Sequence, residues 1–328
     1  MKQWLHPGFW LTLLIVMALG LAPVFTRNAG LRETGFTILL AISMAVSLNI
    51  IMGYTGYVSF GHVVFYGLGG YTGMYLMDTW GAPLPLAVLG GGAAAALLAF
   101  GLGKAILRLR GAYFALATIG VNEAVRTFVS NFKPFGGPTG IELQFSVYKQ
   151  YGGAADALWL TYYGVIAISV FAVIFSYYIK TSKFGLGLMS IREDEDAAEV
   201  MGVITPDTKT MAFVASAFLP GMLGVLFFFK NGNVEPADAF RLGFSIESLV
   251  MIMLGGQGTL LGPVIGALGY QRLRGFLLTS DAMIGSLPLK DFQLVIAGLL
   301  MLIIILFIPA GLVGWLRQKF AFLRRILV

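Results

Sequence analysis

The chain has 328 residues, of which 58% are hydrophobic and 12% are charged. Soluble domains average about 45 to 50% apolar and 25% charged residues, so this composition excludes a soluble domain and indicates an integral membrane protein. The net charge of +6 is spread over the ends of apolar runs instead of forming a basic stripe, which argues against a nucleic-acid partner and is typical of positive-inside sorting.

Ten apolar runs follow one another along the chain, and most have the length of about 17 to 25 residues that a transmembrane helix needs. Transmembrane β-strands would instead alternate with a two-residue period. The runs cover approximately residues 9–25, 34–52, 63–77, 83–103, 112–131, 158–179, 211–229, 244–254, 264–278 and 292–308. We expect an all-α, polytopic transmembrane helical bundle of about ten spans, in one domain over residues 1–328. The runs at 112–131 and 244–254 could be re-entrant, which leaves between eight and ten crossings.

The first run resembles the core of a signal peptide, because it follows Lys2 and contains a passable cleavage site at Ala18, Leu19 and Gly20. Many further apolar segments follow it without a soluble domain to export. We therefore interpret the first run as an uncleaved first span.

The stretch GYTGYVSFGH, residues 53–62, interrupts the second apolar run. Its three glycines, two tyrosines and two hydroxyl residues predict a broken or re-entrant helix, which a membrane tolerates only where the backbone is buried in protein or lines a cavity. The alternative is close helix packing through glycine, which Gly69 and Gly73 at GxxxG spacing support. If the break lines a pathway, the candidate side chains are those of Asn49, Tyr54, Ser59 and His62.

The run at 112–131 is less hydrophobic than the others and holds Glu123 and Arg126. These two residues are three apart on one helical face, so they can pair, which lowers the cost of placing either charge within the bilayer. A functional interpretation makes Glu123 part of a translocation path. The alternative makes the two residues an orienting pair near a membrane interface.

Residues 180–210 form the most polar stretch of the chain. Ser190 stands three residues before Glu193, which is the spacing of a capping box, so a short helix should begin at about Ser190. Its first turn is rich in acidic residues, which the positive end of the helix dipole favours. Gly202 followed by Pro206 predicts the end of this helix.

Three small or flexible side chains, Ala197, Ala198 and Met201, follow helical spacing from Asp194 and should form one narrow stripe. Such a stripe allows another surface to approach closely. The alternative is that the alanines pack on the membrane domain of the same chain. With ten spans both termini lie on the side of this loop, and most loop and terminal Lys and Arg residues fall there too, which predicts that this side is cytoplasmic.

No catalytic constellation is present. The sequence has no HExxH, no GxSxG and no paired intramembrane carboxylates. Lys104 follows Gly103, but the earlier glycine and the following Ser or Thr of a Walker A motif are missing. Without cysteine, and with only His6 and His62, thiolate and histidine metal centres are not expected either. We expect no catalytic residue, cofactor or metal, so energy for transport must come from another protein or the chain is passive.

Several motifs in the right order resemble the membrane permeases of ABC importers for branched-chain amino acids, specifically the LivM-type subunit. Asp196, Ala197 and Ala198, then three residues and Gly202, are similar to the EAA loop of these permeases, with Asp in place of the usual first Glu. Tyr57 stands where the subfamily is expected to have Gln. The other similar stretches are LNIIMGYTGYVSFGH (48–62), LRLRGAYFALATIGVNEAVR (107–126), GGPTGI (136–141) and SIESLVMIMLGGQGTLLGPVIGA (245–267).

The resemblance covers residues 48–313 and implies a permease subunit of the inner membrane, with both termini in the cytoplasm. It implies four partners: a homologous second permease, two ATP-binding cassette subunits and an extracytoplasmic substrate-binding protein. Residues 180–210 become the cytoplasmic coupling loop, whose contacts with the ATPase are expected from Arg192, Glu193, Asp194, Asp196, Ala197, Ala198 and Gly202. The expected cargo is a branched-chain or other hydrophobic amino acid, with urea, short amides or aromatic acids as the alternative that the same family offers.

A self-sufficient channel or secondary carrier is the rival from another class. A proton-coupled carrier needs ionisable relays deep in the membrane, and only Glu123 and Glu247 qualify. A membrane enzyme is a weaker third interpretation, because the sequence lacks a cluster of acid, base, metal ligand or nucleophile.

Overall fold

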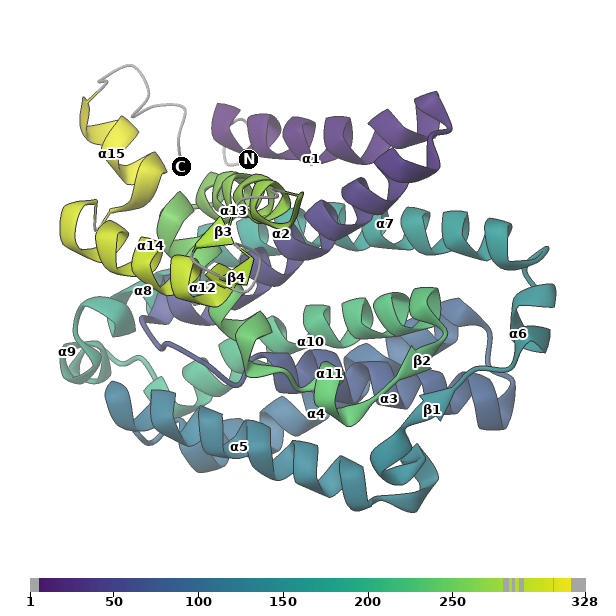
Figure 1. Ribbon diagram of the computed structural model, residues 1–328. Coiled ribbons are helices and arrows are strands. Elements are labelled where there is room, and N and C mark those ends of the chain that lie inside the picture. Colours follow the sequence, from purple (N-terminus) through teal and green to yellow (C-terminus); the bar gives the residue numbers. More distant parts are fainter. Residues whose placement is uncertain (1–5, 280–282, 285–286, 289–291, 309, 320–328) are drawn as a thin grey trace.

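The computed structural model describes residues 6–279, 283–284, 287–288, 292–308 and 310–319, and shows a helical bundle (Figure 1). The ten predicted apolar runs are confirmed as helices, namely α1 (Pro7–Thr26), α2 (Ala29–Thr55), α3 (Val63–Trp80), α4 (Leu84–Ile106), α5 (Ala112–Asn131), α7 (Ala154–Thr181), α10 (Thr205–Asn231), α12 (Leu242–Gly255), α13 (Leu261–Thr279) and α14 (Gln293–Phe307).

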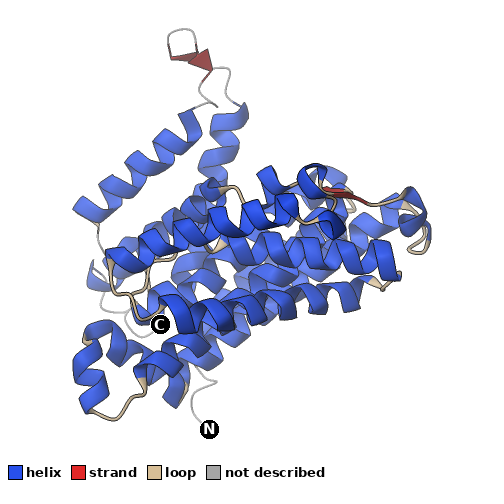
Figure 2. Ribbon diagram, turned by 90° about the horizontal axis from the view of Figure 1, so that it is seen from below, coloured by secondary structure: helices blue, strands red, loops and turns tan. Residues whose placement is uncertain are grey.

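Shorter elements connect these helices. They are α6 (Phe145–Lys149), α8 (Lys183–Glu193), α9 (Glu195–Val200), α11 (Pro236–Ala239), α15 (Gly311–Lys319), the 3-10 turns η2 (Lys133–Phe135) and η3 (Gly137–Thr139), and the strands β1 (Ile141–Glu142), β2 (Asn233–Val234), β3 (Met283–Ile284) and β4 (Leu287–Pro288). The strands form two antiparallel pairs, β1 with β2 and β3 with β4. Figure 2 shows both pairs at the periphery of the bundle.

Five helices of the described part are long and apolar enough to cross a membrane, namely α1, α2, α4, α7 and α10. The remaining runs are shorter or more polar. Helix α12 has 14 residues, and at about 1.5 Å per residue it is shorter than the roughly 30 Å hydrocarbon core of a bilayer. The structure thus establishes a multi-pass helical protein, and the total of ten crossings stays a prediction.

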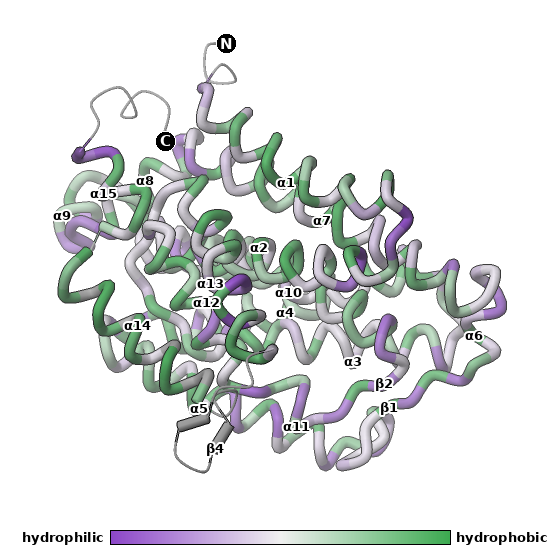
Figure 3. The backbone as a smooth tube through the Cα atoms, turned by 45° about the horizontal axis from the view of Figure 1, so that its top comes forward, coloured by the Kyte–Doolittle hydropathy of each residue, from purple (hydrophilic) through white to green (hydrophobic). Residues whose placement is uncertain are grey.

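Polar segments gather at two ends of the bundle (Figures 1 and 3). One end carries α8 and α9, together with the start of α1 and with α15. The other carries α6, β1, β2 and α11, and Figure 3 shows hydrophilic stretches of chain around β1 and β2. The polar stretch 180–210 and the described ends of the chain therefore share one end of the bundle. The cytoplasmic location of this end stays a prediction.

Helix α2 lies at the centre of the molecule. Of its most apolar 18-residue window, 89% is buried within the chain. It packs on α7, α10, α13, α1 and α12. Its buried polar side chains are satisfied across helices: the hydroxyl oxygens of Ser43 and Ser169 on α7 lie 2.7 Å apart. Because neighbouring helices cover α2 on all sides, it forms the core around which the candidate site is arranged.

The helices α3, α4 and α10 meet through glycine. A Cβ on Gly69 would lie 2.3 Å from the Gly221 carbonyl oxygen, and one on Gly73 would lie 2.4 Å from the Val225 side chain. A Cβ on Gly224 would lie 2.0 Å from the carbonyl oxygen of Tyr66. The alternative interpretation of the GxxxG spacing, close helix packing through glycine, is therefore confirmed.

The interruption after α2 is also confirmed. Helix α2 ends at Thr55, Gly56 adopts a φ of +79°, and the chain stays non-helical until α3 begins at Val63. Ser59 and His62 within this break are fully buried. Most of this irregular backbone is therefore covered by protein, which is the condition under which a membrane tolerates it. We call residues 56–62 the α2–α3 break.

Candidate functional site

The polar loop folds into two short helices instead of one. Helix α8 begins after Ser182, whose hydroxyl accepts a hydrogen bond from the amide of Gly185. Helix α9 begins after Asp194, whose carboxylate accepts hydrogen bonds of 3.0 Å from the amides of Asp196 and Ala197. The predicted capping box at Ser190 is wrong. The chain is already helical there, so the Ser190 hydroxyl donates back to a carbonyl within α8 and cannot cap a new helix.

The predicted stripe is divided between two environments. Ala198 is only 2% exposed and packs within its own chain, as the alternative interpretation expects, and its role in coupling stays a prediction. Ala197 is exposed, and so are Val200 (88%), Met201 (84%) and Ile204 (68%). The predicted end of the helix is confirmed, because α9 ends at Val200 and Gly202 has a φ of +90°. We call Ala197, Val200, Met201 and Ile204 the α9 tip.

The base of α9 is held by a buried ion pair. Lys209 in the first turns of α10 places Nζ 2.6 Å from Oε1 of Glu195. Tyr57 of the α2–α3 break donates its hydroxyl to Oε2 of Glu195 at 2.6 Å, and Nζ of Lys209 lies 2.9 Å from that hydroxyl. Nζ also donates to the carbonyl of Leu107, which connects α4 to α5. Four segments distant in sequence therefore meet at one carboxylate.

The exposed Arg110 contacts this cluster on its solvent side. Arg110 donates through Nη2 to Oδ1 of Asp196 at 2.8 Å, and its Nε lies 3.6 Å from Oε2 of Glu195. Exposed pairs of this kind contribute little to stability, because solvent screens them. The Arg110 contact therefore orients α9, whereas the buried pair of Lys209 and Glu195 anchors it.

The second anchor joins α8 to the end of α2. Arg192 donates through Nη1 to the carbonyl of Gly53 at 2.8 Å. The residues that join α12 to α13 lie against the same helix end, because the side chain of Asn49 both donates to the carbonyl of Thr259 and accepts from the amide of Gly258, each at 3.0 Å. Lys180 donates to the Gly258 carbonyl at 3.0 Å. Movement of α8 would therefore pull on the last turns of α2, directly before the α2–α3 break.

Electrostatics make the attachment of α9 sensitive to acid. Partial burial raises the pKa of the Glu195 carboxyl, but hydrogen bonds from Lys209 and Tyr57 outweigh it, so that the net pKa lies below its usual range. The hydrogen bond from Arg110 lowers the pKa of Asp196. A lowered folded-state pKa gives stabilisation that is complete above the unfolded value, about 4 for these carboxyls, and is lost as the pH falls through the folded value.

We therefore expect α9 to stay attached from pH 8 down to about pH 4 and to loosen only below it. Because the sequence has no cysteine, a spin label on Met201→Cys reports α9 alone. Its mobility should rise only in acid, whereas Glu195→Gln should raise it already at pH 7. A rise in mobility between pH 7 and 5 in the otherwise unaltered chain would contradict this assignment.

The residues predicted for a path lie at or beside the α2–α3 break. Tyr54 shares a hydrogen bond of 2.8 Å with Ser176 on α7, and Asn49 holds the connection between α12 and α13, so both have structural partners. His62 contacts the hydroxyl of Ser47 through Nε2 at 3.1 Å, but its Nδ1 has no partner among the described residues, and neither has the hydroxyl of Ser59. A role of these four residues in transport stays a prediction.

Helix α5 covers the break from outside. Its Thr118 hydroxyl accepts from the amide of Phe60 at 3.1 Å, and Asn122 donates to the carbonyl of Phe240 at 3.0 Å. Only four of its residues are buried, namely Phe114, Thr118, Asn122 and Val129. Glu123 and Arg126 form the predicted pair at 3.3 Å, and both lie on the exposed face of the helix. The pairing is confirmed, and the face that carries it has no partner within the described chain.

A pocket of about 340 Å³ opens at the end of the bundle opposite α9. Three cationic side chains, those of Lys230, Arg241 and Arg274, line it together with the carboxylates of Glu235 and Asp238. Its apolar wall consists of Phe36, Leu40, Tyr66, Phe227, Phe228 and Phe244. The pocket lies beside the α2–α3 break, because Tyr66 is one helical turn from His62. We call it the mixed-charge pocket.

Sequence reasoning missed most of the cluster that holds α9. In the sequence, Tyr57 stands out only as a departure from the family pattern, and no motif marks Lys209 or Glu195. The one signal for the cluster was a lysine in the first turns of a long apolar helix, since a buried lysine needs a carboxylate partner. No group of three or more possible metal ligands occurs in the described residues.

A family model described as the permease component of a branched-chain amino acid transport system matches residues 32–305. The chain is 27% identical to the high-affinity branched-chain amino acid transport system permease protein LivM of Escherichia coli (strain K12), over 94% of this chain and 76% of that protein. It is also 27% identical to the probable LivM permease of Methanocaldococcus jannaschii, over 63% of this chain and 61% of that protein.

Similarity extends to the second type of permease, since LivH of Escherichia coli (strain K12) is 24% identical over 48% of this chain and 46% of that protein. No solved structure matches the chain. The family match covers most of the sequence, and the helical fold is consistent with a membrane permease. The chain therefore belongs to the family of branched-chain amino acid transport permeases and is of the LivM type.

Proposed function

We propose that the chain is the non-catalytic permease subunit of an ATP-driven importer, and that it lets branched-chain or other hydrophobic amino acids cross the inner membrane. The observation that carries this proposal is the α9 tip. Three apolar side chains, Val200, Met201 and Ile204, are exposed on a short polar loop that is anchored to the membrane domain. Such a patch on an otherwise polar segment is typical of a protein interface.

The partner of the α9 tip is one of two ATP-binding cassette subunits. When these subunits close on ATP, they displace α9. The displacement reaches α10 and the break through Glu195, Lys209 and Tyr57, and it reaches the end of α2 through Arg192. Rigid-body motion of one packed group against another then switches access from one side of the membrane to the other. In this proposal α8, α9 and both termini lie in the cytoplasm.

The exposed face of α5 is the expected contact with the homologous second permease. Glu123 and Arg126 lie well inside a 20-residue helix, and charged side chains at such positions are costly when they face lipid. A second permease or a water-filled path between the two subunits removes this cost. The predicted role of Glu123 in the path is consistent with this arrangement.

The mixed-charge pocket is the expected place where cargo arrives from the extracytoplasmic binding protein. A zwitterionic amino acid offers a carboxylate to Arg241 or Lys230, an ammonium group to Asp238 or Glu235, and an apolar side chain to the aromatic wall. Pockets for small molecules commonly combine apolar walls with a few convergent polar groups in this way. Uncharged urea or a short amide would form no ion pair with the charged side chains of this pocket.

Docking of the ATPase can be tested at the α9 tip. Met201→Glu should lower the amount of ATPase that co-purifies with the permease by at least about tenfold, which corresponds to about 1.4 kcal/mol, because a carboxylate would be desolvated at the interface. Met201→Leu should leave it unaltered, since it keeps apolar surface of similar size. Equal recovery of the ATPase with Met201→Glu and Met201→Leu would show that the tip is not the docking surface.

The function itself is tested by reconstitution. In liposomes the chain alone should not take up labelled leucine, whereas the complex with second permease, ATPases and binding protein should do so only with ATP. Saturable uptake by the chain alone would instead establish a secondary carrier or channel. Uptake of urea, but not of leucine, by the complex would show that the proposed substrate is wrong. The proposal of an ATP-driven importer would still hold.

A further inference from the structure

An apolar groove runs along the outside of the bundle between α4 and α7. Helix α10 packs on both helices and forms the floor of the groove. The groove has a volume of about 630 Å³, and no charged residue lines it. Its lining comes from Leu84, Pro85, Val88 and Leu89 on α4, from residues 160–171 on α7, and from Phe218, Met222 and Leu226 on α10.

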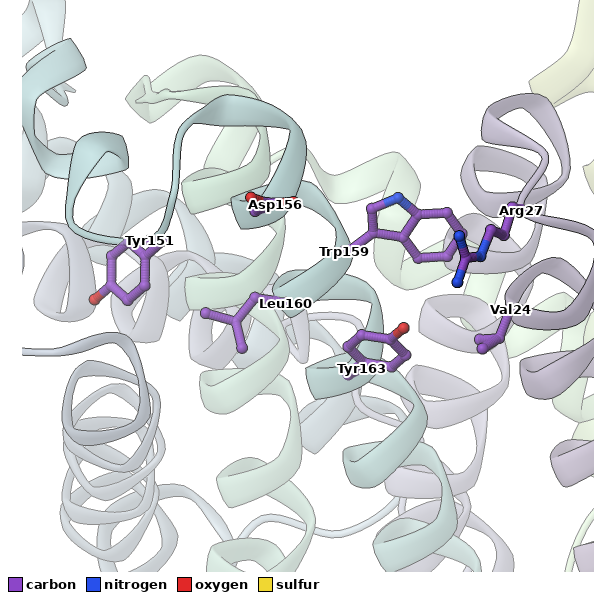
Figure 4. Close-up of a pocket in the computed structure, with 7 residues that line it drawn as sticks. All are labelled: Val24, Arg27, Tyr151, Asp156, Trp159, Leu160 and Tyr163. Atoms are coloured by element: carbon purple, nitrogen blue, oxygen red, sulfur yellow. The ribbon is translucent and has the colours of Figure 1, made fainter.

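A second, polar pocket of about 770 Å³ lies at the upper end of this groove, where α1 ends and α7 begins (Figure 4). It is lined by Val24, Arg27, Tyr151, Asp156, Trp159, Leu160 and Tyr163. Figure 4 shows the Arg27 guanidinium beside the Trp159 indole, with Tyr163 below them and Asp156 on the neighbouring turn of α7. Tyrosine and tryptophan are the side chains that concentrate at the membrane interface.

The two cavities adjoin each other, because Leu160 and Tyr163 line both. Along α7 the groove extends from Leu160 to Phe171, eleven residues or about 17 Å at 1.5 Å per residue. Half of a bilayer's hydrocarbon core is about 15 Å thick. The groove therefore has about the length of one leaflet's hydrocarbon layer, and the polar pocket adjoins its end nearer the start of α7.

The polar pocket holds one free cation and one free anion. Within the described residues, neither Arg27 nor Asp156 takes part in a hydrogen bond or ion pair with another side chain. The nearby Arg32, by contrast, is occupied, since it lies 5.0 Å from the centre of the Trp159 ring and contacts Glu33. Opposite charges that are left unpaired in one pocket suit a ligand that carries both signs.

We propose that the groove and the polar pocket together bind one zwitterionic glycerophospholipid with a primary ammonium headgroup, in the leaflet next to the start of α7. Arg27 binds the phosphate, Asp156 accepts hydrogen bonds from the ammonium group, and one acyl chain fills the groove between α4 and α7. An arginine binds phosphate with charge-assisted hydrogen bonds, whereas an apolar groove selects only for a hydrocarbon chain. Both parts are needed to distinguish this lipid from any other.

Native mass spectrometry of the full-length chain, purified alone and in complex with its co-purifying partners, tests the proposal. The probes are phosphatidylethanolamine, phosphatidylglycerol and phosphatidylcholine of identical acyl chains. One phosphatidylethanolamine molecule should bind at least about tenfold more tightly than phosphatidylglycerol, which lacks the ammonium group. Phosphatidylcholine should also bind less tightly, because its headgroup cannot donate a hydrogen bond to Asp156.

Three variants assign the binding to this site. Arg27→Gln should weaken binding of all three lipids, Asp156→Asn should abolish the preference for phosphatidylethanolamine, and Ala167→Trp, within the groove, should reduce binding of every lipid. Lys149→Gln and Glu142→Gln remove charges outside both pockets and should alter neither affinity nor preference. Equal binding of the three lipids, or lipid bound by the isolated chain but displaced in the complex, would overturn the proposal.

Discussion

Lys209→Met is expected to abolish ATP-driven uptake and to lower the free energy of unfolding by about 3 to 5 kcal/mol, the usual cost of removing one partner of a buried ion pair. The side chain of Lys209 is 3% exposed and that of its partner Glu195 is 13% exposed. Methionine keeps the length and the apolar stem of lysine, so the loss comes from the charge and its three hydrogen bonds. Thermal unfolding of the purified chain and uptake by the reconstituted complex measure the two effects.

A double variant distinguishes lost pairing from lost packing. Lys209→Met with Glu195→Leu removes both charges, and it should recover much of the stability while uptake stays low, because the link from α9 to α10 is still missing. Lys183→Met removes an exposed lysine from α8 and serves as the matched control, with no expected change. If the double variant were as unstable as Lys209→Met alone, the ion pair would not be the anchor of α9.

Gly224→Ala is expected to prevent assembly of the membrane domain, although it adds a single methyl group. The new Cβ would lie 2.0 Å from the carbonyl oxygen of Tyr66 and 3.0 Å from the amide nitrogen of Gly70. Both are backbone atoms of α3, so no side-chain rotation relieves the overlap and α3 must separate from α10. Because cores tolerate even extra methylenes only at about 1 to 3 kcal/mol or more, a backbone separation should exceed that cost. The measurement is the yield of monodisperse protein after gel filtration.

Gly101→Ala provides the control for this variant. Gly101 lies in α4, and a Cβ added there would meet no atom within 4 Å. Alanine in the middle of a helix is favoured over glycine by about 0.5 to 1 kcal/mol, so this variant should be at least as stable as the unaltered chain. A normal yield of Gly224→Ala would mean that α3 and α10 pack less closely than their backbones indicate.

The elements that could be predicted from the sequence are those that depend on local hydropathy. Helix α5 begins and ends at the predicted residues, and each of the ten apolar runs is a helix. The α2–α3 break was also predictable, because three glycines in ten residues interrupt an apolar run. Lipid and buried protein both select apolar side chains, however, so hydropathy alone does not separate full crossings from the shorter helices such as α12.

The elements that could not be predicted depend on contacts between distant residues. Both Ser190 and Asp194 satisfy the rules for a helix cap. Asp194 caps α9, whereas Ser190 lies inside α8, which already begins after Ser182. Glu195 and Tyr57 are 138 positions apart, and no spacing rule connects them. The burial of Ala198 but not of Ala197 likewise depends on how α9 rests on the rest of the chain.

The enclosed position of α2 has a consequence for the order in which the protein is made. Helix α2 leaves the ribosome early, but α7, α10 and α13, which cover it, begin only at residues 154, 205 and 261. Until then Asn49 lacks both of its partners in the folded chain, which lie at residues 258–259. Ser47 can contact His62 early, but it still lacks the carbonyl of Ser216. A nascent α2 must therefore be sheltered by the insertion machinery or by lipid, and premature release of α2 is the step at which biogenesis is most vulnerable to error.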